Sequence, residues 1–205
     1  NPLNIVNNGI CVNDKGERFT DEGQTYVQMS RDVAAMTKAN WAYMIVDQTG
    51  HDVPILANDW ESYKRTKAPV YVGQTLDEAA EKAGLPVDAV KATVKAYNEA
   101  IAAGKGKTLT PVNTLPKART VEKAPFYIVP FQGGMTATFG GPLINVKGQV
   151  LDTENHVIDG LFAIGNAAGG LFYDNYIGGA QRTSAAVYGI VVADFVKAAK
   201  TPAGK

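Results

Sequence analysis

The chain has 205 residues, of which 45% are hydrophobic, and this is enough apolar material to bury one good core or two modest ones. Twenty Lys and Arg residues balance twenty Asp and Glu residues, and the two signs are equally numerous again from Phe126 to the end. This balance excludes a strongly basic surface, so we expect neither nucleic acid nor an anionic membrane as a partner.

Cysteine content and hydropathy exclude further classes. The single cysteine, Cys11, excludes an intrachain disulfide and a multi-cysteine metal or iron–sulfur site, and we expect it to be an inert apolar residue rather than a nucleophile. We expect no metal. The longest uncharged run, 124–146, contains three prolines and four glycines, which a membrane-spanning helix would not tolerate. The chain opens without Met or a signal peptide, which we interpret as the middle of a larger protein, and its compartment, cytoplasmic or periplasmic, stays open.

The first elements expected along the chain are a β-hairpin, a helix and a strand. Two short apolar stretches, 10–12 and 18–20, flank an Asp-Lys-Gly turn and are predicted to pair as a hairpin that ends at Glu22. A helix is expected to follow from about 25 to 38. The apolar run 42–46 is then predicted to be a buried strand.

The clearest helical pattern starts at Thr75. Thr75 and Glu78 form the signature of a capping box, in which the hydroxyl and the carboxylate accept hydrogen bonds from backbone N–H groups. Gly84 is expected to end this helix, and Pro86 to begin a second one. The second helix has one apolar face, formed by Leu85, Val87, Val90, Val94, Tyr97 and Ile101.

A change in composition marks a domain boundary. Residues 105–123 are dominated by Gly, Thr, Pro and Lys and lose their periodicity, as linkers do, so we place a boundary near Pro125. The segments 125–131 and 142–165 are predicted to form strands separated by Gly, Asp and Asn turns. A terminal helix is expected from about Gln181 to Ala199.

The segment GNAAGGLFYDNYIGGA, residues 165–180, places eight Gly and Ala residues, including two Gly-Gly pairs, between a predicted strand and the terminal helix. Glycine clusters mark turns or places where the backbone closely approaches another group. A glycine-rich turn that leads into a helix presents unpaired N–H groups and the positive end of the helix dipole, which suits an anion or developing negative charge. The alternative is that these glycines only allow the strand to pack closely against small helix residues, namely Ser184, Ala185, Ala186 and Gly189.

From Lys123 to Ala180 the sequence KAPFYIVPFQGGMTATFGGPLINVKGQVLDTENHVIDGLFAIGNAAGGLFYDNYIGGA resembles the C-terminal portion of the flavoprotein family that includes fumarate reductase, succinate dehydrogenase, flavocytochrome c and 3-ketosteroid dehydrogenase. GICVNDKGERFTDE resembles the start of the family's substrate-capping domain, and the helices with AYNEAIAAGK resemble its end. The resemblance covers nearly the whole chain. It implies an α+β substrate-capping domain over 1–124, followed over 125–205 by the C-terminal strands and helix of a Rossmann-like, α/β FAD-binding domain.

The resemblance implies FAD as the cofactor. The Gly178-Gly179 turn and the N–H groups of Gln181 and Arg182 are expected to face the N1/O2 edge of the flavin, where reduction leaves negative charge, and so to raise the reduction potential. Asn166 matches a position that contacts the ribityl chain in relatives, and its amide can donate or accept such hydrogen bonds. The implied cofactor-binding residues are Gly165, Asn166, Gly178, Gly179, Ala180, Gln181 and Arg182.

One part of an FAD site is missing from the sequence. The chain contains no strand-Gly-x-Gly-x-x-Gly-helix unit, which would bind the ADP pyrophosphate. FQGGMTATFGG is no substitute, because no helix of apolar period follows its glycines. We therefore expect the N-terminal FAD-binding half either to have been removed from this polypeptide or to be supplied by a second chain.

The substrate side departs from the fumarate reductase pattern. Those enzymes carry an Arg directly before the Leu-Gly-Gly of the final glycine turn and a His three residues before the Gly-Gly of TFGG, where this chain has Tyr176 and Ala137. At the place of the Arg that donates a proton in those reductases, an alignment on AYMIVDQTGHD brings His51. These departures argue against fumarate or succinate as the substrate. Tyr176 matches the tyrosine with which the steroid dehydrogenases polarise a carbonyl oxygen, which favours a ketone, an enone or a less charged acid.

The residues that could carry protons are Tyr176, His51, Glu22 and Arg31. Each has a simpler interpretation. His51 follows a turn glycine and could be an exposed loop histidine, whereas Glu22 and Arg31 could form either a proton relay in the capping domain or an ordinary surface ion pair. Phe172 and Tyr173 either line the substrate pocket or pack under the cap.

Two functions of different kinds agree with these residues. The first is part of an FAD-dependent oxidoreductase that moves a hydride between flavin N5 and an activated C–C bond of a small organic substrate, together with an electron-transfer partner. The second is a non-catalytic fragment or subunit that serves assembly or electron-transfer contacts, which would explain the missing dinucleotide motif and the altered substrate residues. Flavin absorbance in the complete gene product distinguishes the two.

Overall fold

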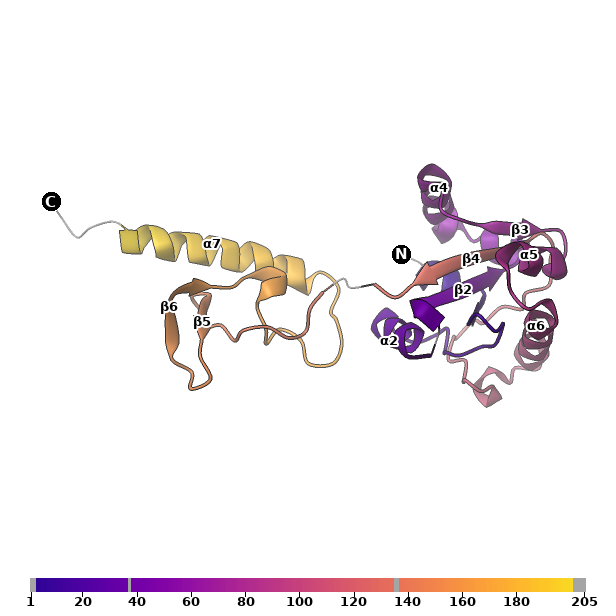
Figure 1. The fold of residues 1–205 in the computed structure, drawn as a ribbon, viewed down its shortest axis with the longest axis horizontal. Helices are drawn as coiled ribbons and strands as arrows, with labels where there is room; N and C mark the ends of the chain where they lie inside the picture. The colour runs from indigo at the N-terminus through magenta and orange to yellow at the C-terminus, as the bar shows by residue number, and fades with distance from the viewer. Residues whose placement is uncertain (1–2, 37, 135–136, 201–205) are drawn as a thin grey trace. The chain divides into compact units, whose positions relative to one another are not determined.

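The computed structural model describes residues 3–36, 38–134 and 137–200, which form two compact units, Asn1–Gly134 and Met135–Lys205 (Figure 1). The first unit is built on a four-stranded sheet with helices on both faces. The second is built on a two-stranded sheet and one long helix. Among the described helices, none is both long and apolar enough to cross a bilayer.

The sheet of the first unit is antiparallel throughout and has the strand order β1-β2-β4-β3. Its strands are β1, Ile10–Val12; β2, Trp41–Val46; β3, Tyr71–Gly73; and β4, Phe126–Gln132. The last strand in the sequence, β4, pairs with the whole of β2 on one side and with β3 on the other. The end of this unit in sequence is therefore central to its sheet.

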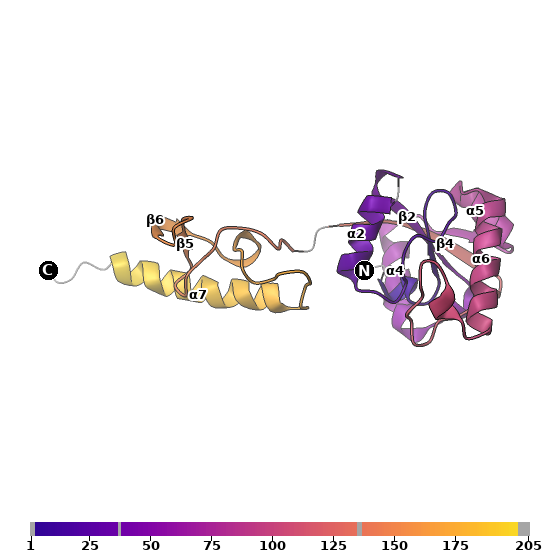
Figure 2. The same ribbon diagram turned by 90° about the horizontal axis from the view of Figure 1, so that it is seen from below.

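Both faces of this sheet are covered by helices. One face carries the short α1, Leu3–Val6, together with α2, Tyr26–Met36, and α4, Ala57–Thr66. The other face carries α5, Leu76–Ala83, and α6, Val87–Ala102. Figure 2 shows α2 and α6 on opposite sides of β2 and β4. A strand that is covered on both faces needs apolar residues at successive positions, which explains the continuous apolar run of β2.

The alternation of side chains along β2 divides the core in two. Ala42, Met44 and Val46 belong to the cluster that includes residues of α1, α2 and α4. Tyr43 and Ile45 point to the opposite face, where they belong to the cluster that includes residues of α5 and α6. The prediction of a buried strand at 42–46 is therefore confirmed, with Trp41 added at its start.

The helix signals predicted around Thr75 are confirmed. The hydroxyl of Thr75 accepts a hydrogen bond from the N–H of Glu78 (3.1 Å), and the Glu78 carboxylate accepts one from the N–H of Gln74 (2.7 Å), one residue before the cap. Gly84 has a φ of +70° and ends α5 in the left-handed conformation that glycine favours. Pro86 is the N-cap of α6, whose buried residues are Val90, Val94 and Tyr97.

Two predicted elements of the first unit differ in the structure. Residues 18–20 do not form a strand, because Arg18 makes only a single bridge to Val12 and the strand partner of β1 is β2. The polar side chains of this segment instead reach carboxylates, Arg18 to Glu22 and Thr20 to Asp32. The helix expected over 25–38 is α2, which ends at Met36, and residue 37 lies outside the described residues.

Three elements of the first unit were not predicted from the sequence: α4, β3 and the short helix α3, Gln48–His51. Asp47, directly after β2, is the N-cap of α3, since its carboxylate accepts a hydrogen bond from the N–H of Gly50 (2.8 Å). Gly50 therefore lies inside a helix rather than in a turn, and His51 is the last residue of that helix.

The end of the predicted capping domain, at Ala124, stays a prediction. In the structure β4 continues the sheet of the first unit, and the compact units divide between Gly134 and Met135. A strand that pairs with two others of a sheet belongs to the same compact unit, whichever domain it is assigned to in the complete fold.

The second unit has a small core of its own. Its strands are β5, Gln149–Leu151, and β6, Val157–Phe162, and its helix is α7, Ala180–Lys200, so the strands and the terminal helix predicted there are confirmed. The buried core residues of this unit are Val150, Ala163 and Ala168. Other apolar side chains of β6 and α7 are exposed, among them Ile158 (41%), Leu161 (46%), Val187 (51%) and Ile190 (66%).

Candidate functional site

The N-terminal end of α7 carries unpaired backbone donors. The helix begins at Ala180, directly after the two glycines at 178–179, and the N–H of Thr183 donates to the carbonyl of the second glycine (3.0 Å). Among the described residues, the N–H groups of Gln181 and Arg182 have no hydrogen-bond acceptor. Because α7 is 21 residues long, this end also carries the positive pole of a helix dipole. It therefore favours an anion or an electron-rich carbonyl oxygen.

A buried amide lies in the first turn of the same helix. Gln181 is 6% exposed, and within the described part of the chain neither Nε2 nor Oε1 of its side chain has a hydrogen-bond partner. A buried polar group without a partner costs roughly 1–3 kcal/mol, so it needs one in the functional protein. The amide both donates and accepts, and a ring that presents a carbonyl oxygen next to an N–H would satisfy it.

The glycines before α7 are not explained by packing within the described chain. A Cβ atom at Gly178 or at Gly179 would meet no heavy atom within 4 Å. Gly179 has a φ of +85°, which favours glycine, but Gly178 does not share this conformation. At Gly165, in contrast, a Cβ would lie 3.1 Å from the Cβ of Ala185. Close packing against α7 therefore explains why position 165 is a glycine, but it does not explain the glycine at position 178.

The turn at Asn166 lies against a second segment of the second unit. The hydroxyl of Thr138 donates a hydrogen bond to the carbonyl oxygen of Asn166, and the N–H of Gly169 donates to the carbonyl of Pro142 (2.9 Å). The TFGG segment and the 3₁₀ turn η4, Gly165–Ala167, are thus neighbours, and the side chain of Asn166 is at the surface. Two regions singled out in the sequence therefore meet in one place.

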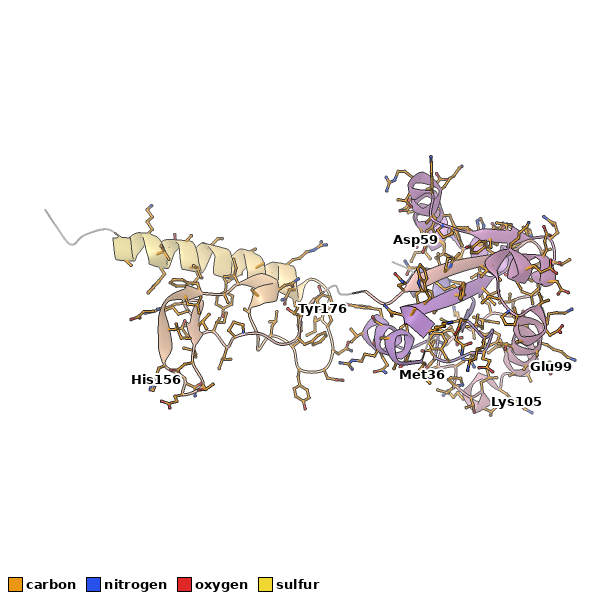
Figure 3. The ribbon with its side chains drawn as sticks, viewed as in Figure 1. Met36, Asp59, Glu99, Lys105, His156 and Tyr176 are labelled. Atoms are coloured by element: carbon orange, nitrogen blue, oxygen red, sulfur yellow. The ribbon has the colours of Figure 1, made fainter. Side chains whose placement is uncertain are left out.

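Tyr176, which is labelled in Figure 3, lies on the loop before α7 and belongs to a chain of three contacting aromatic rings. The centroid of its ring is 5.1 Å from that of Phe172, which in turn is 5.5 Å from that of Phe139. The N–H of Tyr176 donates to Oδ1 of Asn175 (2.9 Å). Tyr173 is 100% exposed. Of the two aromatic residues predicted to lie near Tyr176, Phe172 therefore contacts it, and Tyr173 points to solvent.

In the first unit, His51 packs against two aromatic rings. Its imidazole stacks on Trp60 (centroids 4.6 Å apart, 25° between planes) and on Tyr127 (4.3 Å, 15°). Nδ1 lies 3.0 Å from Oδ1 of Asp52, and Nε1–H of Trp60 donates to the His51 carbonyl (3.0 Å). The side chain is 28% exposed. The interpretation of His51 as a merely exposed loop histidine is therefore wrong, because the residue belongs to α3 and its ring packs on Trp60 and Tyr127.

Glu22 is buried in an ion pair with Arg18. Nη2 of Arg18 lies 2.6 Å from Oε2 of Glu22 and Nε lies 2.9 Å from Oε1, and the two side chains are 5% and 0% exposed. The carboxylate also accepts hydrogen bonds from the N–H of Cys11 (3.1 Å) and from Nδ2 of Asn113 (2.9 Å). Burial, and then the charge of Glu22, raise the pKa of the Cys11 thiol, which keeps it protonated and unreactive.

The remaining candidate of the first unit, Arg31, is an exposed residue of α2. The charged partner that the structure gives Glu22 is Arg18, so the surface ion pair considered for Glu22 is replaced by a buried one. A proton relay through Glu22 and Arg31 stays a prediction. Tyr176 and the glycine-turn residues belong to the second unit, whereas His51, Glu22 and Arg31 belong to the first.

Sequence analysis missed the residues that surround His51 and Glu22. Asp52 follows His51 directly, and a carboxylate next to a histidine is a signal that could have been noticed. Trp60, Tyr127 and Asn113 come from elements distant in the sequence, and no local pattern points to them.

The chain matches the family of FAD binding domains over residues 7–182. It is 31% identical over 191 residues to the NADH:acrylate oxidoreductase of Vibrio harveyi, a match that covers 91% of this chain and 18% of that protein. It is 29% identical over 189 residues to the probable fumarate reductase Ifc3 of Shewanella frigidimarina, covering 90% of this chain and 30% of that protein.

Among solved structures, the open conformation of a flavocytochrome c3 fumarate reductase superimposes with a TM-score of 0.74 at 28% identity, covering 94% of this chain and 33% of that one. These findings confirm the resemblance drawn from the sequence. The chain spans a third or less of the length of these three relatives.

Proposed function

The chain belongs to the family of FAD binding domains, and on this premise we propose that it is part of an FAD-dependent oxidoreductase that transfers a hydride between the flavin and an activated C–C bond of a small organic substrate. The proposed substrate is an enone, a ketone or an unsaturated acid other than fumarate. When bound, FAD supplies the hydride chemistry. The protein has to hold the flavin, orient the substrate and move a proton.

The observation that carries this proposal is the N-terminal end of α7, whose residues fit the flavin. Its unpaired N–H groups and dipole suit a carbonyl oxygen that gains negative charge, and the amide of Gln181 suits a pyrimidine ring with carbonyl and N–H groups. The open space at Gly178 leaves room for a planar ring. The residues proposed to contact FAD are Gly165, Asn166, Gly178, Gly179, Ala180, Gln181 and Arg182.

Tyr176 and His51 are the proposed proton-handling residues. The Tyr176 hydroxyl donates a hydrogen bond to a carbonyl oxygen of the substrate and so stabilises negative charge that spreads from the reacting carbons. Tyr176 precedes the glycine turn by one residue, which ties its backbone to the proposed flavin site. His51 exchanges a proton with the substrate. Glu22 and Arg31 are proposed to resupply that proton.

The names of the relatives support an unsaturated acid. One of them is named for acrylate, which carries a single carboxylate, and the other for fumarate, which carries two. A second carboxylate needs further charged partners, and this chain has Tyr176 and Ala137 where the fumarate reductases place Arg and His. A substrate with one carboxylate or none fits these residues better.

We further propose that the pyrophosphate-binding part of the FAD site comes from protein outside these 205 residues, either in the same gene product or in a partner chain. The sequence lacks the glycine-rich βαβ motif, and apolar residues of β6 and α7 are exposed in the second unit. Electrons would reach the flavin from a separate electron-transfer partner.

The test replaces Tyr176 by Phe in the complete flavoprotein. This substitution removes one hydroxyl and leaves the ring that packs on Phe172, so FAD content and the flavin spectrum should be unchanged. Turnover should fall by about 10²–10⁴-fold if the hydroxyl polarises or protonates the substrate. The matched control is Tyr173→Phe, which removes a hydroxyl from an exposed residue of the same loop and should leave turnover unchanged.

Normal turnover of Tyr176→Phe would mean that Tyr176 only lines the substrate pocket. The proton donor would then be His51, Glu22 or Arg31. Absence of flavin from the complete gene product would contradict the oxidoreductase itself and favour the non-catalytic subunit.

A further inference from the structure

The surroundings of His51 form a continuous hydrogen-bonded network. The Tyr127 hydroxyl donates to Oε1 of Gln48 (2.8 Å), and Nε2 of Gln48 donates to Oδ1 of Asp52 (2.6 Å). The same Asp52 oxygen lies 3.0 Å from Nδ1 of His51. The ring of Tyr127 that starts this network also stacks on the imidazole. The strand β4 therefore contacts His51 directly, through the ring of Tyr127, and indirectly, through the side chains of Gln48 and Asp52.

This network favours one of the two neutral tautomers of His51. Asp52 is a carboxylate and only accepts, so it favours the tautomer in which Nδ1 is protonated and donates to it. The hydrogen bond from His51, followed by that from Gln48, lowers the pKa of Asp52, which keeps the acceptor ionised at neutral pH. Among the described residues, no partner occupies Nε2, so this nitrogen stays available to another molecule.

The two stacked rings fix the plane of the imidazole. Both rings stack on the imidazole, with their own centroids 5.8 Å apart, and Nε1–H of Trp60 also donates to the His51 carbonyl. An imidazole packed against two rings cannot turn freely about its Cβ–Cγ bond, so Nδ1 stays directed at Asp52. Because the Asp52 side chain is 60% exposed, the pair adds little to stability, and its effect is on orientation.

We propose that Asp52, supported by Gln48 and the rings of Trp60 and Tyr127, is a positioning residue that holds His51 with Nδ1–H on Asp52 and presents Nε2 for proton exchange with the substrate. The proposal rests on the role given to His51 in the proposed function. It names the nitrogen that carries the proton and the residues that select it.

The chain contains only two histidines, which allows a direct test by ¹⁵N NMR of the 205-residue chain. In the neutral ring of His51, Nδ1 should have the shift of a protonated, pyrrole-type nitrogen and Nε2 that of an unprotonated, pyridine-type nitrogen. An unconstrained imidazole prefers the reverse. His156 is the internal reference, because it is on an exposed hairpin turn (Figure 3) and its Nδ1 lies 3.6 Å from the nearest carboxylates.

Two variants separate the parts of the network. Asp52→Ala should shift His51 towards the Nε2–H tautomer, whereas Asp52→Asn, which can retain an acceptor oxygen, should largely preserve the wild-type tautomer. The shifts of His156 should not change in either variant. An Nε2–H tautomer of His51 in the wild-type chain, or shifts that do not respond to Asp52→Ala, would overturn the proposal.

An activity measurement in the complete flavoprotein keeps this proposal distinct from the proposed function. Asp52→Ala should lower kcat by about 10–100-fold with little change in KM, as the loss of partners that orient a reactive group does in metal sites. If His51→Ala has normal turnover, His51 is not the proton carrier and the proposed function fails there, although the tautomer result can still hold. If His51→Ala loses turnover and Asp52→Ala does not, the positioning role fails alone.

Discussion

Arg18 and Glu22 form a bidentate ion pair that is almost completely buried, with side chains 5% and 0% exposed. Removing one charge of such a pair leaves the other without a partner in a poorly solvated place. We therefore predict that Glu22→Gln lowers the free energy of unfolding by about 3–5 kcal/mol. Both tryptophans, Trp41 and Trp60, belong to the first unit, so urea denaturation followed by tryptophan fluorescence reports on it directly.

The matched control for this prediction is the exposed pair of Lys91 and Asp77, which are 2.8 Å apart with side chains 50% and 44% exposed. Lys91→Gln should leave the free energy of unfolding close to the wild-type value, because solvent screens an exposed pair. Equal losses in the two variants would show that the Arg18–Glu22 pair is solvated like a surface pair.

Asp47 ties α3 to the segment that precedes β4, and its charge should make stability depend on pH. Burial raises the pKa of this carboxyl, but four hydrogen bonds lower it by more, so that its pKa in the folded protein lies below the ordinary value. The donors are the hydroxyl of Thr49 and the N–H groups of Gly50, Glu122 and Lys123.

The unfolded chain therefore binds the Asp47 proton more readily than the folded one, and the stabilisation is fully present above the unfolded pKa of about 3.9. It is lost as the pH falls through the folded pKa. We predict that Asp47→Asn loses more than about 2 kcal/mol at pH 7, since hydrogen bonds to a charged group contribute about 1.5–3 kcal/mol each. The difference from wild type should narrow as the pH falls below about 4.

Urea denaturation at a series of pH values measures this difference. Glu61→Gln is the control, because the Glu61 side chain is 76% exposed, and its curve should follow that of wild type. A difference between Asp47→Asn and wild type that stays constant down to the acid limit of folding would mean that the charge of Asp47 is not what stabilises this junction.

Much of this architecture follows from local patterns. The cap at Thr75, the left-handed stop at Gly84 and the doubly buried strand β2 depend on neighbouring residues, and they were predictable from the sequence. The unpaired N–H groups after the glycine turn were predictable for the same reason, because a helix start exposes N–H groups whatever packs around it.

The remaining features depend on contacts between distant parts of the chain. Glu22 meets Asn113 across 91 residues, and His51 meets Tyr127 only because β4 pairs with β2. Such contacts are set by tertiary packing, which no single-sequence period encodes. The partnerless amide of Gln181 could not be foreseen either, because burial of a polar side chain at a helix start depends on what surrounds that helix.

Gly178 offers a test of flavin contact that is independent of turnover. A methyl group at this position meets nothing within 4 Å in the described chain, and its φ is not in the left-handed range, so Gly178→Ala should leave stability unchanged. If the flavin ring lies against this backbone, the added methyl should cost about 1–3 kcal/mol, or about 5–150-fold in FAD affinity of the complete protein.

Gly189→Ala is the matched control, because Gly189 is inside α7, the helix that follows Gly178, and its Cβ would be 4.0 Å from its nearest neighbour, Ile164. This variant should bind FAD normally and gain up to about 1 kcal/mol in stability, because alanine favours a helix interior. FAD titration of the two apoproteins by fluorescence quenching decides the question. Equal affinities would place the flavin away from the glycine turn.

The final prediction concerns the choice between one carboxylate and two. Fumarate and acrylate both offer an activated C=C bond, and they differ by the second carboxylate, which the fumarate reductases that this chain resembles bind with Arg and His. With Tyr176 and Ala137 in those places, two charge-assisted hydrogen bonds are missing, each contributing about 1.5–3 kcal/mol. Together they amount to about 10²–10⁴-fold in transition-state binding, so kcat/KM for fumarate should fall below that of the clamped reductases by this factor. Acrylate should be affected less, and Tyr176→Arg should raise the fumarate-to-acrylate ratio of kcat/KM.

Steady-state assays of the complete enzyme with both acids and a reduced electron donor measure this ratio. Efficient fumarate reduction by the unmodified enzyme would show that its substrate carboxylates are bound elsewhere.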